Sequence, residues 1–568
     1  MAHQIRSSLA VVGRWVTSIG PERAHLRADI VAGLPRAISS VPDGMAAAVL
    51  VGVNPVQGLY AGFAGPIAGG LSSHTRLMVI TTTSAAALAA GSALQGVPPA
   101  QRPAAVALLV ILVGVALVAA GLARLGRYTR FVSYSVMTGF LTGISVNIVC
   151  GQIADLTGAP AQGDFPLAKA VNVLTHPGRI NLASLLAGLG ALAILALLAR
   201  TRLAVVSSLF ALVIPTAVVI LAGAASVARV GDAGGIPAGI PLPHLPDVRL
   251  FSFSLVTGAL AVAAIVLVQG AGVAEAAPNP GDARPNPDQD IIAQGAGNLA
   301  SGFFRGIPVG GSVGQTALNV SVGAKTRWAA IWSGLWLLVI LALFSGLVAK
   351  IAVPTLAAIL IFAAIGSLQP GEVRSIMRTG RSSQIAVITT FAATLFLPVA
   401  AAVGIGVALS LLLQLNQDAM DLAVVELVPR DDGLFEERKP PAVLASGQVT
   451  ILDVYGSLMY AGSRTLQAHL PDPGGARSPV VVLRLRRRTS LGATFVKVVG
   501  DYADRLAEAG GRLYLSGLDP SLTERLRRTG HLDGPVRAFE ATPIVGASTR
   551  AASLDAEAWL VTRHHGSG

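Results

Sequence analysis

Two short stretches of this chain are rich in small and hydroxyl residues and carry no charge. The first, 79–88, carries the hydroxyl residues Thr81, Thr82, Thr83 and Ser84. The second, 306–319, carries the polar residues and glycines Gly310, Gly311, Ser312, Gln315 and Thr316. Hydroxyl groups donate hydrogen bonds, and glycines let a solute approach the backbone N–H groups closely. Both stretches are therefore candidates to bind a small anion without a matching fixed charge.

The two stretches lie among long apolar segments. The chain has 568 residues, of which 53% are hydrophobic and 13% are charged, whereas soluble domains average about 25% charged residues. Residues 104–123 and 328–349 contain no charge, and each is close to the roughly 20 residues that cross the hydrocarbon core as a helix. The composition predicts a multi-pass protein of the cell membrane, with the lipid bilayer as its surroundings.

The positive charges indicate how the chain is oriented. The net charge is +12, but Arg and Lys stand at the ends of apolar segments rather than in a basic stretch interleaved with aromatic residues. This is the positive-inside bias and argues against a nucleic-acid partner. Residues 1–27 are polar and basic and have no apolar core of a signal peptide. We expect them to form a cytoplasmic N-terminal segment, with the C-terminus cytoplasmic too.

The sequence offers no pattern of enzyme chemistry. His74, His176 and His244 are isolated, and Cys150 is the only cysteine. The glycine-rich stretch at 310–312 lacks the lysine of a phosphate-binding loop. We therefore expect no enzymatic activity, no metal site, no cofactor and no transport driven by ATP.

The apolar region 28–418 divides into fourteen segments. Their centres lie near residues 40, 64, 85, 113, 141, 191, 214, 264, 296, 318, 339, 361, 391 and 408. The two polar stretches are the third segment of each half, a pattern typical of inverted repeats whose short, broken helices build a substrate site near mid-membrane. Helix N-termini there would face the solute with free N–H groups and a partial positive charge. Re-entrant loops or ordinary packed helices remain the alternative.

The composition changes after Asn416, where half of the charged residues fall in about a quarter of the chain. Alternating and β-branched residues predict strands, and apolar residues at helical spacing predict helices. The expected strands are 449–455, 480–485 and 513–516, and the expected helices are 495–509 and 521–529. Strands alternating with helices predict a small cytosolic α/β domain at 445–546, after a linker at 419–444 and before a tail at 547–568.

Motifs in a fixed order along the chain resemble those of the SulP family, the sulfate permease and prestin-type anion transporters. They are Arg27–Leu34, Val41–Ala46, Gly52–Tyr60, Asp290–Gly302 and Pro308–Ser312 with Thr316. Leu513–Leu518 and Leu526–Gly530 resemble the C-terminal STAS domain of the same family. The resemblance extends over some 500 residues.

The resemblance implies an all-α membrane domain of seven plus seven inverted spans, followed by a STAS domain. In it a core domain (segments 1–4 and 8–11) moves against a gate domain (5–7 and 12–14), as an elevator does, in a homodimer. The implied function is secondary active transport of a small oxyanion, with sulfate as the family default and bicarbonate or a dicarboxylate as alternatives. A nucleobase-like transporter and a non-transporting membrane anchor for the STAS domain are the other hypotheses.

The chain departs from the family pattern at two amides. Many members carry an acidic residue in the eighth segment, where a gapless count places Gln269; a shifted alignment would place Glu275 there instead. Many members also carry Arg before the Thr of the tenth segment, where this chain has Gln315. Gln269 and Gln315 are expected to hydrogen-bond the oxyanion or each other, and Glu275 stays a candidate for binding a coupling ion.

Asp43 is a third departure, at a position where the family more often has Gln. It follows Pro42, which interrupts the helical hydrogen bonds and frees a carbonyl. Because a carboxylate in an apolar segment is costly without a purpose, we hypothesise that Asp43 takes up the H⁺ or Na⁺ that accompanies the anion. A carboxylate that caps a half-helix at the water interface is the alternative.

The STAS resemblance is incomplete in one loop. Related bacterial proteins carry an Asp and a phosphorylated Ser or Thr there, and this chain has Gly492 and Thr494 at those positions. Phosphorylation of Thr494 is therefore not expected. The preceding residues Arg486, Arg487 and Arg488 are expected to contact phospholipid, a nucleotide or only water.

Overall fold

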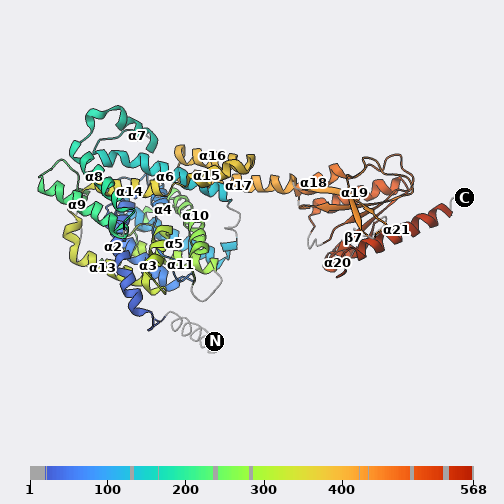
Figure 1. The fold of residues 1–568 in the computed structure, drawn as a ribbon, viewed down its shortest axis with the longest axis horizontal. Coiled ribbons are helices and arrows are strands. Elements are labelled where there is room, and N and C mark those ends of the chain that lie inside the picture. Colours follow the sequence, from blue (N-terminus) through green and yellow to red (C-terminus); the bar gives the residue numbers. More distant parts are fainter. Residues whose placement is uncertain are drawn as a thin grey trace. The chain divides into compact units, whose positions relative to one another are not determined.

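The protein is represented by a computed structural model (Figure 1). It describes residue 20 and residues 22–127, 133–163, 165–201, 203–233, 241–279, 286–420, 422–432, 434–458, 460–486, 491–528 and 536–565. The chain divides into two compact units between Ser410 and Leu411, and each unit has its own architecture.

The apolar segments of the first unit form helices. These are α2 (Leu26–Val51), α3 (Val56–Ser72), α4 (Ser84–Ala93), α5 (Arg102–Leu122), α6 (Tyr134–Thr157), α7 (Pro166–Thr175), α8 (Leu182–Leu198), α9 (Ser207–Leu221), α10 (Phe253–Ala276), α11 (Pro287–Phe303), α12 (Val313–Ser321), α13 (Trp328–Val348), α14 (Val353–Gly366), α15 (Pro370–Thr379), α16 (Arg381–Phe396) and α17 (Val399–Met420). Each of the fourteen expected centres lies inside one of them. Two three-residue strands, β1 (Ile80–Thr82) and β2 (Val309–Gly311), immediately precede the two short helices.

Several of these helices have the length and hydropathy of membrane spans. Among the described residues five helical runs qualify, and they are Arg102–Leu122, Tyr134–Thr157, Ala204–Leu221, Phe253–Ala276 and Val353–Thr379. Helices α2 and α3 qualify together as a pair bent by 118°. The chain is thus a multi-pass membrane protein, whereas a total of fourteen spans stays a prediction.

Helices α2 and α3 contact each other through their backbones. A Cβ atom on Gly58 would lie only 1.7 Å from the carbonyl oxygen of Gly44, so no larger residue fits at this crossing. Helix α2 ends at Gly52, whose φ of 80° is the left-handed conformation that glycine adopts at low cost. The close crossing gives α2, which carries Asp43, a fixed position against its neighbour.

The helices of the first unit pack into two groups. In one group α2 packs against α3, α4 and α13, while α11 packs against α3, α5 and α10. In the other, α6 packs against α8, α14 and α16, and Ser133 before α6 donates its backbone N–H to Ser410 of α17. The groups meet where α2 contacts α9 and α14. The division into core and gate domains stays a prediction.

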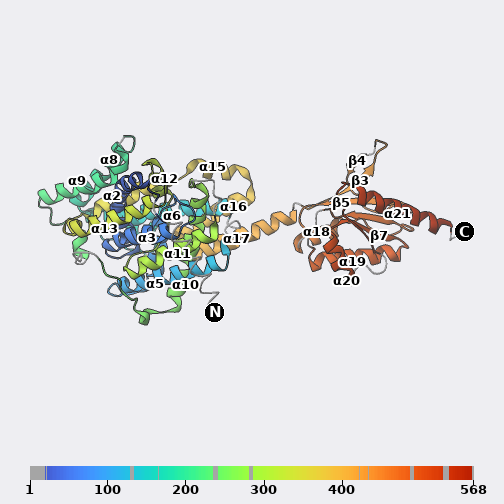
Figure 2. The same ribbon diagram turned by 90° about the horizontal axis from the view of Figure 1, so that it is seen from below.

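The second unit contains a six-stranded sheet with strand order β4-β3-β5-β6-β7-β8. The strands are β3 (Ala423–Pro429), β4 (Phe435–Arg438), β5 (Val449–Tyr455), β6 (Val480–Arg484), β7 (Arg512–Leu518) and β8 (Val536–Glu540). Strands β5 to β8 are parallel, and β3 and β4 are antiparallel to their neighbours. Helices α19 (Ala493–Glu508) and α20 (Pro520–Arg528) cover one face and α21 (Ala547–His565) covers the other (Figure 2).

The strands and helices predicted for this unit are confirmed within two or three residues at each end, but its predicted boundaries are wrong. The expected linker at 419–444 contains β3 and β4, which extend the sheet. The expected tail at 547–568 contains α21, whose Ala552, Ala556 and Leu560 are buried against the sheet. The helix covers Ile451, Val480, Val482 and Tyr514 of the sheet.

Replacing Leu560 by alanine is expected to destabilise the second unit by roughly 2–4 kcal/mol, because the side chain is buried between α21 and the sheet. Replacing the exposed Leu554 of the same helix is the matched control and should cost no more than about 0.5 kcal/mol. Hydrogen exchange of the β6 and β7 amides in the full chain measures both. Equal protection in the two variants would mean that α21 is a tail after all.

Candidate functional site

The two polar stretches, more than two hundred residues apart, are joined by a small antiparallel ladder. Strand β1 pairs with β2 in the register Ile80–Gly311, Thr81–Gly310 and Thr82–Val309. Ser312 extends the pairing by donating its backbone N–H to the carbonyl oxygen of Val79 at 2.9 Å. Each strand is followed at once by a short helix of 10 or 9 residues, α4 or α12.

This ladder makes the N-termini of α4 and α12 face each other. Because the strands are antiparallel, the helices leave the ladder at opposite ends, and each presents its N-terminus toward it. Three residues of strand span about 10 Å, which sets the scale of the separation. The first N–H groups of a helix have no intrahelical acceptor and carry partial positive charge. The ladder therefore assembles two positive helix ends around one small region.

Hydroxyl residues cap both helix ends. The side chain of Thr83 accepts a hydrogen bond from the N–H of Ala86, and that of Ser312 accepts one from the N–H of Gln315, each at 3.3 Å. By helix geometry the N–H groups of the first two residues of each helix remain without intrahelical acceptors. These residues are Ser84 and Ala85 in α4, and Val313 and Gly314 in α12. Val313 and Gly314 are exposed, Ser84 is partly buried and Ala85 is buried.

The other residues of the two stretches have more varied surroundings than the sequence indicated. Thr81 is fully buried, and its hydroxyl has no hydrogen-bond partner among the described residues. Thr82 is also buried. The hydroxyl of Thr316 accepts the N–H of Val79 at 3.0 Å and so ties α12 to the residue before β1. Thr316 thus has a positioning contact in addition to any contact with a solute.

Gly310 and Gly311 lie against helix α10, a neighbour that the sequence did not indicate. A Cβ on Gly311 would lie 3.0 Å from the Cα of Gly270, and one on Gly310 would lie 3.2 Å from the side chain of Val266. The N–H of Gly311 is already donated to Oε1 of Gln294 at 3.0 Å. Glycine is therefore favoured at these two positions because β2 packs closely against α10.

Asp43 and Gln315 contact each other. Gln315 donates its Nε2 to Oδ2 of Asp43 at 2.7 Å and to the hydroxyl of Ser39 at 3.4 Å. The hydroxyl of Ser40 donates to Oε1 of Gln315 at 3.5 Å. The amide of Gln315 is thus held by α2, and the structure pairs it with Asp43 rather than with Gln269. The two residues are 272 positions apart, and the sequence gave no sign of this contact.

Gln269 lies beside the N-terminus of α4. It lines a cavity together with Ala85 of α4, Phe140 of α6 and Thr390 of α16. The cavity is small, about 30 Å³, and has room for one or two water molecules. The Oε1 atom of Gln269 and the hydroxyl of Thr390 are buried there with no hydrogen-bond partner among the described residues. The cavity itself is lined by apolar surface, so these two atoms lie behind its wall.

Sequence reasoning missed Phe140 and Thr390, and it left Gln269 and Glu275 as alternatives. The pair Thr389-Thr390 in an apolar helix is the signal that would have indicated Thr390. Glu275 is exposed near the end of α10 and borders a different cavity, with Asp290 and Gln294. Of the two candidates, Gln269 is the one that lies beside α4.

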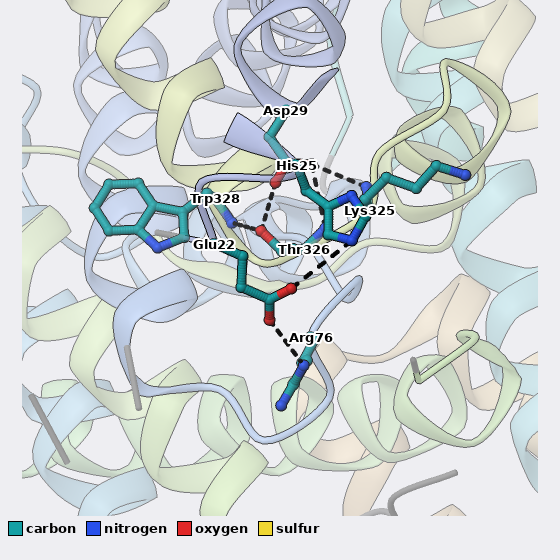
Figure 3. Close-up of polar contacts among 7 residues, drawn as sticks. All are labelled: Glu22, His25, Asp29, Arg76, Lys325, Thr326 and Trp328. Carbon is teal, nitrogen blue, oxygen red and sulfur yellow. Dashed lines mark hydrogen bonds and ion pairs between the residues drawn. The ribbon is translucent and has the colours of Figure 1, made fainter. Parts of the chain in front are cut away.

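Two buried carboxylates accept hydrogen bonds from the segments that flank the candidate site, one after α12 and one between α3 and β1. Asp29 of α2 accepts hydrogen bonds from the N–H groups of Lys325 and Thr326 and from the Thr326 hydroxyl, just after α12, while Glu22 pairs with Arg76 nearby (Figure 3). Asp290 of α11 does the same before β1. It accepts from the hydroxyl of Ser73, the N–H of His74, and the N–H and hydroxyl of Thr75, at 2.6–3.0 Å. Helix α12 is thus attached to α2 near both of its ends.

The loop compared with bacterial phosphorylated proteins lies partly outside the described residues, which omit Arg487, Arg488, Thr489 and Ser490. Gly492 stands at the N-cap of α19, and Thr494 lies in its first turn. The guanidinium of Arg486 donates to the carbonyl oxygens of Thr542 and Ile544 at 3.4 and 3.5 Å. Arg486 is therefore at least partly engaged with the chain itself.

Comparisons with known proteins give a consistent result. The model of the sulfate permease family matches residues 26–393. A Mycobacterium tuberculosis protein described as a "Probable sulfate transporter" is 28% identical over 525 residues, 90% of this chain and 93% of its own. The bicarbonate transporter BicA of a Picosynechococcus strain is 26% identical over 345 residues, 59% of this chain and 60% of its own. The murine solute carrier 26 family member A9, an anion transporter, has the same fold, with a TM-score of 0.83 at 19% identity over 96% of this chain and 94% of its own.

Proposed function

This chain belongs to the sulfate permease family, and we propose that it is a secondary active transporter of a small oxyanion, with sulfate as the first candidate. The observation that carries the proposal is the β1–β2 ladder, which presents the N-termini of α4 and α12 to one region. Backbone N–H groups and partial positive charge suit an anion.

The anion is bound between the helix ends, with Ser84, Ala85, Val313 and Gly314 donating N–H groups. Thr81 and Gln269 have side-chain atoms without partners, and these add hydrogen bonds. The other candidate residues position these donors. They are Thr82, Thr83, Gly310, Gly311, Ser312, Gln315 and Thr316. An oxyanion fits this set because each of its oxygens accepts more than one hydrogen bond.

Transport proceeds as an elevator of inverted repeats. Helices α2–α5 and α10–α13 form the moving core, and α6–α9 and α14–α17 form the gate. The cavity beside Ala85 supports this assignment, because Ala85 and Gln269 come from the first group and Phe140 and Thr390 from the second. Sliding of the core along the gate widens the cavity to one side of the membrane at a time. The protein acts as a homodimer with cytoplasmic termini, and its second unit is a STAS domain.

Replacing Asp43 by asparagine is expected to remove the dependence of uptake on a proton or sodium gradient. The carboxylate lies beside the site, faces Gln315, Ser39 and Ser40, and shares its helix face with Arg36. Protonation or Na⁺ binding at Asp43 offsets its negative charge while the anion is bound. Uptake by the wild type should rise toward acid pH or with inward Na⁺, and uptake by the Asn variant should not. An unchanged response of the variant to both gradients excludes Asp43 as the coupling residue.

Bicarbonate is the second candidate, because a bicarbonate transporter is among the relatives of this chain. Uptake of labelled sulfate, bicarbonate, succinate and uracil into proteoliposomes, under imposed pH and Na⁺ gradients, distinguishes the hypotheses. We expect saturable uptake of sulfate. Uptake of bicarbonate or succinate alone would identify that anion, and not sulfate, as the substrate. Uptake of uracil alone would favour a nucleobase-like transporter. No uptake of any solute by folded protein would contradict the transport function.

A further inference from the structure

Arg36 is a fully buried arginine without a partner. Its exposed fraction is 0%, and none of its three guanidinium nitrogens has a hydrogen-bond partner among the described residues. It lies ten residues after the start of α2 at Leu26, about 15 Å along the helix. A buried charge is costly unless it is paired and hydrogen-bonded. The guanidinium of Arg36 therefore needs a hydrogen-bonding partner that the described residues do not supply.

The helical spacing places Arg36 on the face of α2 that carries the candidate site. Arg36 precedes Ser39, Ser40 and Asp43 by three, four and seven residues, so all four lie along one side of the helix. The last three all hydrogen-bond Gln315 of α12. Side chains tilt toward the N-terminus of their helix. The guanidinium therefore lies on the side facing α12, beyond Asp43 toward the N-terminal end of α2.

The two carboxylates on this face do not neutralise Arg36. Asp29, seven residues earlier, accepts its hydrogen bonds from Lys325 and Thr326. Asp43 accepts from Gln315. Neither forms an ion pair with Arg36 among the described residues. The nearest unpartnered acceptor known on α12 is Oδ1 of Asn319, one turn after Gln315, and it is neutral.

The chemistry of a guanidinium selects the kind of partner. It has five N–H donors in a planar fork, which one water molecule or one amide oxygen cannot satisfy. An oxyanion with two oxygens on one side binds the fork through two parallel hydrogen bonds and cancels the charge. We propose that Arg36 binds the transported oxyanion as a fixed positive charge of the pathway, about two turns of α2 before Asp43 on the same face of the helix. This inference rests on the proposed transport function and adds a binding position to it.

The proposal assigns Arg36 a share of the selectivity for anions over neutral solutes. Helix ends and amides accept both anions and polar neutral molecules, whereas a buried guanidinium has no favourable contact with an uncharged solute that lacks strong acceptors. In this chain Arg36 of α2 supplies the positive charge that many relatives carry as Arg at the position of Gln315.

Binding of labelled sulfate to the full chain in lipid nanodiscs, together with uptake in proteoliposomes, tests the proposal. Arg36→Gln keeps hydrogen-bond donors but removes the charge, and should weaken sulfate binding by about tenfold or more. Arg36→Lys keeps the charge but loses the planar fork, so its sulfate affinity should lie between that of the wild type and that of Arg36→Gln. Lys350→Gln, which removes an exposed cation from the same unit, is the control and should bind as the wild type does.

Arg36→Met separates binding from folding. If Arg36 serves the anion, this variant should lose sulfate binding yet melt at the wild-type temperature or above it when sulfate is absent, since a buried unpaired charge has been removed. A clearly lower melting temperature without sulfate, or an Arg36→Gln variant that binds sulfate within about twofold of the wild type, overturns the proposal. If the wild type takes up bicarbonate in place of sulfate, the same variants are measured with labelled bicarbonate. Failure of the wild type to bind or transport any oxyanion would contradict the proposed function instead.

Discussion

Replacing Ala85 by aspartate is expected to abolish anion uptake while leaving the protein folded. Ala85 is the second residue of α4 and lines the cavity that contains Gln269. A carboxylate there occupies the N–H groups that the substrate would use and repels a second anion. Two unit charges about 4 Å apart repel by about 4 kcal/mol at an effective dielectric constant near 20, which is a loss of affinity of a hundredfold or more.

The asparagine variant at the same position is the matched control, because it has nearly the same size without the charge. Ala85→Asn should retain a measurable part of the uptake, and Ala85→Asp should retain none. Size-exclusion profiles and melting temperatures of both variants check that they are folded, and a carboxylate at a helix N-terminus is itself favourable for folding. Equal losses in the two variants would mean that the site is sensitive to volume and not to charge.

Replacing Gly311 by alanine is expected to reduce uptake by roughly tenfold or more, because the new methyl group forces β2 away from α10. Its carbon would lie 3.0 Å from the Cα of Gly270, a backbone atom that cannot rotate aside. The displacement breaks the hydrogen bond from the Gly311 N–H to Gln294 and moves the N-terminus of α12 relative to that of α4.

Gly272, two residues further along α10, provides the control for this prediction. A Cβ at Gly272 meets nothing within 4 Å, so Gly272→Ala should transport at close to the wild-type rate. Initial rates of labelled sulfate uptake in proteoliposomes, normalised to the folded protein recovered, measure both variants. Wild-type transport by Gly311→Ala would show that the contact of β2 with α10 does not set the geometry of the site.

The sequence was sufficient to single out the two stretches of the candidate site, but not to predict how they pair. Their composition distinguishes them from the surrounding apolar helices, and the position of each in its half indicated a short, broken helix. Strands of three residues leave no periodicity to detect, and pairing between residues 80 and 311 is a tertiary event. The contact between Asp43 and Gln315 depends on the same ladder, so it could not be predicted either.

The errors of the sequence analysis also have physical reasons. Helix α21 buries two alanines and one leucine on its apolar face, too weak a pattern to distinguish it from a polar tail. Strand β4 lies at the edge of the sheet and is fully exposed, and three of its four residues are charged, so it has no apolar pattern to detect. Strand β3 lies between β4 and β5 and is mostly apolar, and the sequence analysis missed it. The sequence analysis did not consider Arg36, and only the structure shows that its nitrogens are buried without a partner among the described residues.

The position of a bound tetrahedral oxyanion tests the central claim most directly. A crystal structure of the full chain with selenate, located by the anomalous signal of selenium, would give that position. The account predicts a peak between the N-termini of α4 and α12, within hydrogen-bonding distance of the N–H groups of Ser84 or Ala85 and of Val313 or Gly314. A selenate ion bound elsewhere in a protein that transports it, with both helix ends unoccupied, would contradict the account.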